Sequence, residues 1–185
     1  MIPLFKVFMA LAAPDAAADV LKSGYIGQGP KVDEFEKQLT SIFTPRDFNY
    51  NAITTNSATS AEHLIYHYLK RDRKLTKNFG TGIVNVDWKA LDEDSTVLTT
   101  PLTCTATNWP ILLNGLKMKW VDVDPNTMNM CLDDLERKID STTRVITVVH
   151  WGGYPIDLNR LRRIVTSAKE KYGNEIMIVE DCAHA

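Results

Sequence analysis

The sequence of 185 residues has few cysteines and no excess of charge of one sign. Its three cysteines, Cys104, Cys131 and Cys182, are odd in number, far apart and outside any Cys-x-x-Cys pattern. They indicate neither a disulfide framework nor a zinc cluster, so we expect no metal centre and a reduced, cytoplasmic compartment. The net charge of −2, with acids and bases interspersed, offers no basic field for a polyanion. We therefore expect no nucleic-acid partner.

Apolar runs of membrane-spanning length are also missing, so we expect no membrane association. Residues 7–13 resemble the core of a short signal peptide, but Pro3 and Pro14 bracket them and a helix start follows at Asp15. We expect this segment not to direct secretion. No internal repeat or low-complexity tract is visible, and the length suits one domain with a substantial core.

The hydrophobic periodicity predicts two N-terminal helices and then an alternation of strands and helices. The first helix is expected at 15–23, ended by Gly24, and the second at 32–42. Strands are expected at 52–55, 97–100, 119–123, 144–149 and 176–179, and helices at 60–69, 106–113, 132–139 and from 158 to Gly173. This alternation favours an α/β fold, a three-layer, doubly wound and mainly parallel sheet with right-handed crossovers.

Three details of this assignment can be checked directly. Helix 60–69 is expected to bury the stripe formed by Ala61, Leu64, Ile65 and Tyr68. Residues 70–94 are charged and interrupted by glycines, which indicates a surface excursion. Pro110 falls within helix 106–113, and we expect a helix to tolerate it only in the first turn.

The C-terminal tail carries the sharpest chemical pattern. Four apolar residues at 176–179 precede Glu180 and Asp181, and His184 follows three residues later. The pattern predicts a strand buried on both faces that delivers Asp181 and His184 to its C-terminal end. Ligands of open α/β sheets bind at that end. An ordinary solvated strand end is the alternative for the two acids.

The segment Thr55-Asn56-Ser57-Ala58-Thr59-Ser60 lies between a predicted strand and a predicted helix. The start of a helix presents unpaired N–H groups and the positive end of its dipole, which together bind a phosphate. The same residue types are common as plain helix caps. Both interpretations stay open on the residues alone.

Other patterns are weaker. Glu62, His63 and His67 lie close together on one helix, but no His-Glu-x-x-His motif or third ligand accompanies them. Gly27-Gln28-Gly29 follows a helix, whereas a dinucleotide loop follows a strand. His150-Trp151-Gly152-Gly153 suits a tight turn near a ligand or a plain loop.

Taken together, the segment at 55–60, the segment Pro101-Leu102-Thr103-Cys104-Thr105-Ala106-Thr107 and the tail resemble the DegT/StrS-type sugar aminotransferases, which use pyridoxal phosphate. The resemblance extends over 2–185 except 70–94, and Gly27 to Pro30 before Val-x-x-Phe-Glu at 32–36 is among its most specific matches. It implies the N-terminal part of the large domain of a fold type I enzyme. Residues 1–50 would form a helical arm and 51–185 a βα core, with the small C-terminal domain outside the chain.

The resemblance also implies roles for six residues. Ser57, Ala58 and Thr59 match a Ser-Gly-Thr turn that cups the cofactor phosphate, with alanine in the place of glycine. Asp181 would pair with the pyridinium nitrogen and keep it protonated, and His184 would approach the phenolic oxygen of the ring. Cys104 occupies the position of an aromatic residue that stacks on the ring.

The function implied by the resemblance is amino transfer from an amino acid such as glutamate to a keto group on a nucleotide-linked sugar, by a homodimer. The lysine that holds the cofactor as a Schiff base in this family lies downstream of the Asp-x-x-His segment, beyond Ala185. We therefore expect no catalytic residue in this chain and no activity of the isolated chain. Two alternatives remain, a sugar dehydratase of the same fold in which histidine replaces the lysine, and a non-catalytic fragment that is stable through association.

Overall fold

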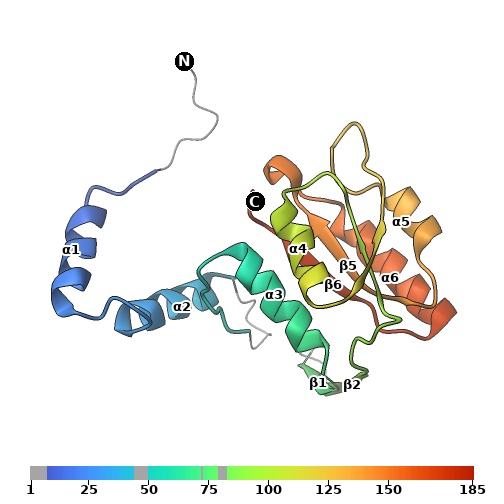
Figure 1. Ribbon diagram of the computed structural model, residues 1–185, viewed down its shortest axis with the longest axis horizontal. Coiled ribbons are helices and arrows are strands. Elements are labelled where there is room, and N and C mark those ends of the chain that lie inside the picture. Colours follow the sequence, from blue (N-terminus) through green and yellow to red (C-terminus); the bar gives the residue numbers. More distant parts are fainter. Residues whose placement is uncertain (1–7, 44–49, 72, 79–82) are drawn as a thin grey trace. The chain divides into compact units, whose positions relative to one another are not determined.

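The computed structural model describes residues 8–43, 50–71, 73–78 and 83–185 (Figure 1). The chain divides into two compact units, Met1–Thr54 and Thr55–Ala185. The first unit contains α1 (Ala13–Ser23) and α2 (Pro30–Phe43), which confirms the two predicted helices. Gly24 ends α1 with a φ of +78°, a conformation that glycine adopts without strain. No residue of either helix is buried within the structure.

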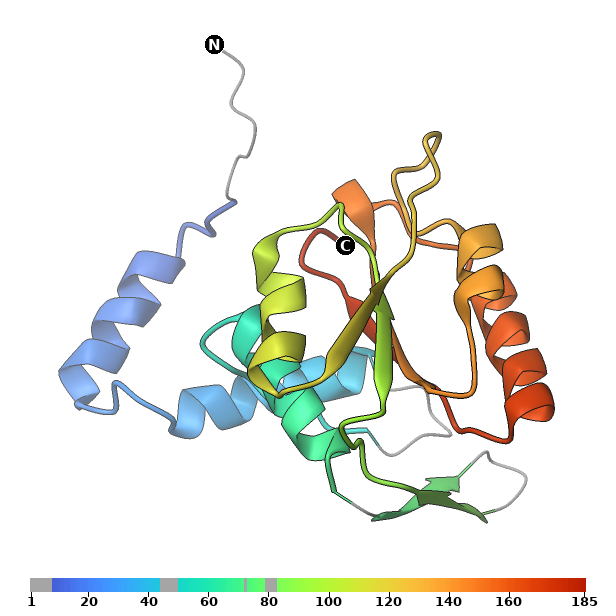
Figure 2. The same cartoon turned by 45° about the vertical axis from the view of Figure 1, so that its right-hand side comes forward.

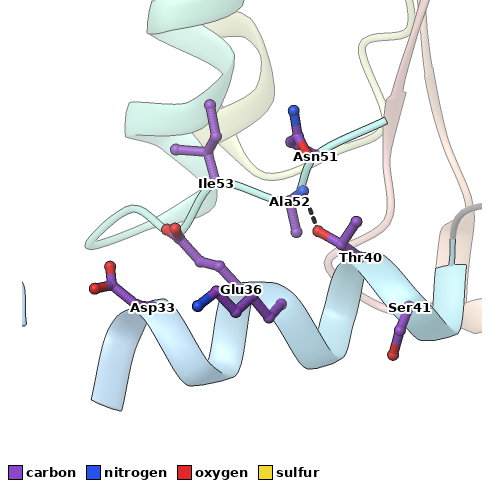
Figure 3. Close-up of a pocket in the computed structure, with 8 residues that line it drawn as sticks. Asp33, Glu36, Thr40, Ser41, Asn51, Ala52 and Ile53 are labelled. Carbon is purple, nitrogen blue, oxygen red and sulfur yellow. Dashed lines mark hydrogen bonds between the residues drawn. The ribbon is translucent and has the colours of Figure 1, made fainter. Parts of the chain in front are cut away.

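The predicted strand at 52–55 is wrong, and α2 supplies the reason. The backbone N–H of Ala52 donates to Thr40 Oγ1 at 2.8 Å, and that of Thr54 donates to Glu36 Oε1 at 2.7 Å. Figure 3 shows Ala52 and Thr40 in contact beside a pocket that Glu36 and Ile53 also line. Two N–H groups that a neighbouring strand would bind are therefore bound by side chains of a helix.

The second unit is built on a four-stranded parallel sheet. Its strands are β3 (Thr96–Thr99), β4 (Lys117–Trp120), β5 (Thr143–Val149) and β6 (Met177–Asp181), in the order β4-β3-β5-β6. The connecting helices are α4 (Thr105–Leu113), α5 (Leu132–Lys138) and α6 (Leu158–Tyr172). The alternation of strands and helices is confirmed, because parallel neighbours need a crossover of this kind.

Helices cover both faces of the sheet, which confirms the three-layer arrangement (Figure 2). One core joins Leu98 and Ile146 of the sheet to apolar residues of α5 and α6. The other core joins Val97 and Val145 to apolar residues of α4 and of α3 (Ala58–Leu69). Successive residues of one strand point to opposite faces, so each central strand serves both cores.

The buried face of α3 differs from the prediction. Leu64, Ile65 and Tyr68 are exposed, whereas Glu62 and Tyr66 are buried. Tyr66 packs with its hydroxyl 2.5 Å from Thr147 Oγ1 of β5, and Glu62 lies against Asp181 of β6. The face of α3 that carries Glu62 and Tyr66 therefore packs against the sheet. The spacing of apolar residues alone does not predict this, because it counts only apolar side chains.

Residues 70–94 are not a simple excursion. They contain an antiparallel hairpin of β1 (Arg73–Asn78) and β2 (Ile83–Trp88); residues 72 and 79–82 of the predicted excursion lie outside the described residues. Trp88 is buried, and its Nε1 donates to the carbonyl oxygen of Leu69 at 2.9 Å. The guanidinium of Arg144 lies 4.9 Å from the centre of the Trp88 ring. The hairpin therefore returns a large aromatic side chain to the core.

The predicted helix at 106–113 is confirmed as α4, but this helix continues through Pro110, which lies beyond the first turn to which we expected proline to be restricted. Proline lacks the N–H that would bind the carbonyl four residues earlier, so the helix loses one internal hydrogen bond there. At the end of the helix, Asn114 Nδ2 donates to Pro110 O at 2.8 Å. Among the described helices, none combines the length and apolar composition that a membrane span requires.

Candidate functional site

The N-terminus of α3 is capped by its own sequence. Ser57 Oγ accepts a hydrogen bond from the N–H of Ser60 at 3.2 Å, and the N–H of Ala61 makes the first helical bond, to Ser57 O at 3.1 Å. The N–H groups of Ala58 and Thr59 precede that bond and have no intrahelical acceptor. Met128 is the only described residue other than glycine with a positive φ, so Ala58 fits this turn without strain. The turn combines a cap with two backbone donors directed away from the helix.

Asp181 ends β6 and is only 8% exposed. Its Oδ2 accepts from Thr107 Oγ1 at 2.6 Å, and its Oδ1 accepts from the N–H of Ala183 at 3.0 Å. Thr107 belongs to the first turn of α4, is fully buried and also contacts Thr103 Oγ1 at 2.8 Å. Each oxygen of the Asp181 carboxylate thus has a protein donor, as a buried polar group requires.

Glu62 is a second buried acid at this position, and the sequence pattern did not identify it as part of the site. It is 5% exposed, and its carboxyl group lies close enough to that of Asp181 for the two to interact electrostatically. Burial, and then the nearby carboxylate of Asp181, raises the pKa of Glu62 from 4.5 to about 8. Glu62 precedes the buried Tyr66 and Leu69 by four and seven residues, so the three lie on one face of the helix. This spacing was the feature of the sequence that could have indicated a buried acid at Glu62.

The remaining tail residues surround the turn after β5. His184 is exposed, and its Nδ1 accepts from the N–H of Gly152 at 3.3 Å, while its ring meets Trp151 edge-on with centroids 5.8 Å apart. Gly153 has a φ of +81°, and a Cβ there would lie 2.7 Å from His184 O. The glycine is required because the tail passes directly against it.

His150 is buried at the end of β5 and has a structural partner on each ring nitrogen. Its Nδ1 accepts from the N–H of Ile156 at 3.2 Å, so the ring proton lies on Nε2, which donates to Glu180 Oε2 at 3.0 Å. The Sγ of Cys182 lies within 4.8 Å of both groups. Burial and the charges of Glu180 and Asp181 raise the pKa of that thiol. Glu180 and Asp181 therefore serve opposite sides of β6.

The structure brings some of the predicted residues together and separates others. Asp181 meets α3 through Glu62 and α4 through Thr107. Both views place the C-terminal end of β6 beside the start of α4 (Figures 1 and 2). Cys104 is the exposed N-cap residue of α4, and no side-chain cap is formed by its free thiol. Of the helix residues Glu62, His63 and His67, which carry no metal motif, Glu62 turns toward Asp181, whereas His63 Nδ1 lies 3.1 Å from Asn114 Nδ2.

Known structures share this arrangement. AtS13 from Actinomadura melliaura is 44% identical with a TM-score of 0.83, and this chain is covered completely. The sugar aminotransferase CalS13 from Micromonospora echinospora is 42% identical with a TM-score of 0.79 over 98% of this chain. The putative sugar aminotransferase Spr1654 from Streptococcus pneumoniae, in its PMP-form, is 28% identical with a TM-score of 0.78 over the whole chain. The expected fold type I architecture is confirmed by these likenesses.

The matches cover only part of each relative. The chain spans 43% of each of these three structures, and 40% and 35% of two curated relatives that it matches. The model of the DegT/DnrJ/EryC1/StrS aminotransferase family matches residues 12–185. The exposed turn at Ser57 and the buried Asp181 thus lie on a scaffold matched along almost its whole length, and the chain belongs to the DegT/DnrJ/EryC1/StrS aminotransferase family.

Proposed function

We propose that this chain forms the cofactor-binding part of a pyridoxal phosphate-dependent aminotransferase that aminates a keto group on a nucleotide-linked sugar. The observation that carries the proposal is the carboxylate of Asp181, buried at the C-terminal end of β6 with a donor on each oxygen. Bound pyridoxal phosphate supplies an electron-withdrawing ring that stores the amino group between two substrates. The ring withdraws electrons best when its nitrogen is protonated, and a fixed carboxylate stabilises that proton.

The donor set of the site fits such a cofactor. The N–H groups of Ala58 and Thr59, the hydroxyl of Thr59 and the positive end of the α3 dipole suit a phosphate dianion. Glu62, which contacts Asp181, lies five residues beyond Ser57, or about 7.5 Å along the helix. A pyridine ring with a phosphate arm can bridge such a distance. The site therefore offers an anion-binding end at the start of α3 and, at the end of β6, the Asp181 carboxylate for the ring nitrogen.

The other predicted residues have supporting places in the proposal. His184 is exposed beside the tail and is proposed to approach the phenolic oxygen of the ring. Cys104, at the start of α4, is proposed to pack against the ring through its sulfur, with less contact area than an aromatic residue. Neither residue is needed to hold the ring proton, which is assigned to Asp181.

The proposal includes a homodimer in the cytoplasm. Large apolar side chains are exposed on α3 and α4, among them Tyr68 at 55%, Trp109 at 58% and Leu113 at 62%. Surfaces of this kind are commonly covered by a partner. The three cysteines are free in the structure, as suits a reducing compartment.

The experiment uses the chain completed with the downstream part that carries the Schiff-base lysine. This protein is titrated with pyridoxal phosphate, followed by absorbance, and glutamate and a nucleotide-linked keto sugar are then added in turn, whereas the chain of 185 residues alone should bind the cofactor reversibly without turnover. We expect saturable binding, conversion of the cofactor to its amine form by glutamate, and an aminated sugar detected by mass spectrometry. Loss of water from the sugar without amination would identify the dehydratase alternative. Failure to bind the cofactor at any concentration would refute the proposal.

A further inference from the structure

Two buried carboxyl groups meet at the end of β6, and only one of them has protein donors. Asp181 accepts from Thr107 and from the N–H of Ala183. In contrast, Glu62 Oε2 is buried and finds no hydrogen-bond partner among the residues that the structure describes. A buried polar oxygen without a hydrogen-bond partner costs free energy. This cost is avoided if the carboxyl group of Glu62 carries a proton and donates a hydrogen bond itself.

Elementary electrostatics decides which acid carries that proton. Two carboxylates in contact in a buried place cannot both be ionised, and they share one proton instead. The negative charge stays where donors stabilise it, on Asp181, so the proton goes to Glu62. The protonated carboxyl then donates to Asp181 and the unpartnered oxygen is explained. Tyr66 on the same helix also lies near Glu62 and Asp181, and its hydroxyl is 2.5 Å from Thr147 Oγ1.

We propose that Glu62 is a positioning residue that remains protonated at neutral pH and donates a hydrogen bond to Asp181. This third donor fixes the Asp181 carboxylate as an anion directed at the ring nitrogen of the cofactor. The second part of this inference rests on the function proposed above, whereas the first part concerns only the protein. The raised pKa of Glu62, about 8, agrees with the first part.

The first test needs no cofactor. Infrared difference spectroscopy of the purified protein at neutral pH should show one protonated carboxyl band that disappears as the pH is raised through about 8. Glu62→Gln should abolish this band. Glu180→Gln, which removes the exposed acid next to Asp181, is the matched control and should leave the band in place. A wild-type spectrum without the band, or a band that survives in Glu62→Gln, would overturn the proposal.

The second test uses pyridoxal phosphate labelled with nitrogen-15 in the ring. Glu62→Gln keeps a neutral donor and should bind within about twofold of wild type with a protonated ring nitrogen, whereas Glu62→Leu should bind about tenfold or more weakly. In the leucine variant the ring proton should move to Asp181, which the nitrogen chemical shift reports. Leucine has nearly the volume of glutamate, so a role in packing alone predicts an unchanged shift.

The outcomes separate this inference from the proposed function. If wild type binds no pyridoxal phosphate, the proposed function fails and the infrared result still decides the protonation of Glu62. If wild type binds it and Glu62→Leu has the same affinity and nitrogen shift, the positioning role is refuted. A glutamine variant as weak as the leucine variant would refute it equally. Should Glu62→Leu not fold, the comparison of wild type with Glu62→Gln decides.

Discussion

The two ends of the candidate site are built in different ways. The turn at Ser57 is exposed, and its hydrogen bonds join residues three or four positions apart. The environment of Asp181 is buried, and its partners Glu62 and Thr107 come from α3 and α4, 119 and 74 residues earlier in the chain. One end is therefore a local structure and the other depends on the completed fold.

This difference predicts how each end responds to change. A local turn that faces water can lose one side chain and keep its backbone donors, so its effects should be small. Changes around a buried carboxylate with partners on three elements should have large effects, because each side chain that is removed leaves a buried polar group without a hydrogen-bond partner. The predictions below test this contrast, beginning with the largest effect.

Asp181→Asn should have the greatest consequence. The amide keeps the shape of the side chain but lacks the charge that holds the proton on the ring nitrogen, so amino transfer should fall by several orders of magnitude. Cofactor binding should weaken less, because one charge-assisted hydrogen bond contributes about 1.5–3 kcal/mol. Steady-state rates and absorbance titrations on the chain completed with its downstream half measure the two quantities. Near-normal turnover of the variant would show that Asp181 does not hold the ring proton.

The same contrast separates what the sequence predicts from what it does not. The cap at Ser57, the left-handed Gly24 and the position of Asp181 after an apolar strand follow from neighbouring residues, and all three features are present. The incorrect predictions concern distant partners. The segment at 52–55 binds side chains of α2 in place of a strand, and α3 buries Glu62 and not Leu64.

Glu62 is the clearest example of a contact that the sequence does not predict. In the sequence it stands beside His63 and His67 in a weak pattern without a clear chemistry, yet the residue that determines its chemistry is Asp181. Periodicity describes which residues share a face of a helix, but not what lies opposite that face. The pairing of the two acids needs the order of the strands and the path of α3 over the sheet, both of which are tertiary information.

The pH dependence of stability should reveal the Glu62 pair. The pKa of Glu62 is raised from 4.5 to about 8, so between these values the unfolded chain has released a proton that the folded chain retains. Unfolded chains then bind fewer protons, and the free energy of unfolding falls as pH rises, by at most about 1.4 kcal/mol per pH unit. The stabilisation is complete below pH 4.5 and is lost as pH passes about 8.

Glu62→Gln removes this contribution, since glutamine does not titrate. Denaturant unfolding at a series of pH values should show a shallower decline for the variant than for wild type between pH 4.5 and about 8. Glu180→Gln should follow the wild-type curve over that range. Parallel curves for wild type and Glu62→Gln would mean that Glu62 is ionised in the folded protein.

A smaller effect is expected where the tail passes the turn after β5. Gly152 and Gly153 both have positive φ, +61° and +81°, so alanine at either position should cost about 1–2 kcal/mol of stability. A Cβ at Gly152 meets nothing within 4 Å, whereas one at Gly153 would lie 2.7 Å from His184 O. Gly153→Ala should therefore be more destabilising than Gly152→Ala in thermal or denaturant unfolding. Equal losses would show that the tail does not pack against Gly153.

The smallest changes in stability should come from the turn at Ser57, where two substitutions separate the cap from the anion site. Ser57→Ala removes the acceptor of the Ser60 N–H and should cost about 1 kcal/mol of stability. Ser57→Asp restores the cap, since aspartate caps as well as serine does, but it places a negative charge where the phosphate is proposed to bind. We expect Ser57→Asp to be as stable as wild type but to bind the cofactor more weakly than Ser57→Ala does. In both variants, the turnover of bound cofactor should change less than the affinity for it. Unfolding curves and absorbance titrations measure this pair of effects. If Ser57→Asp binds pyridoxal phosphate as tightly as wild type does, the turn is a helix cap only and the phosphate binds elsewhere.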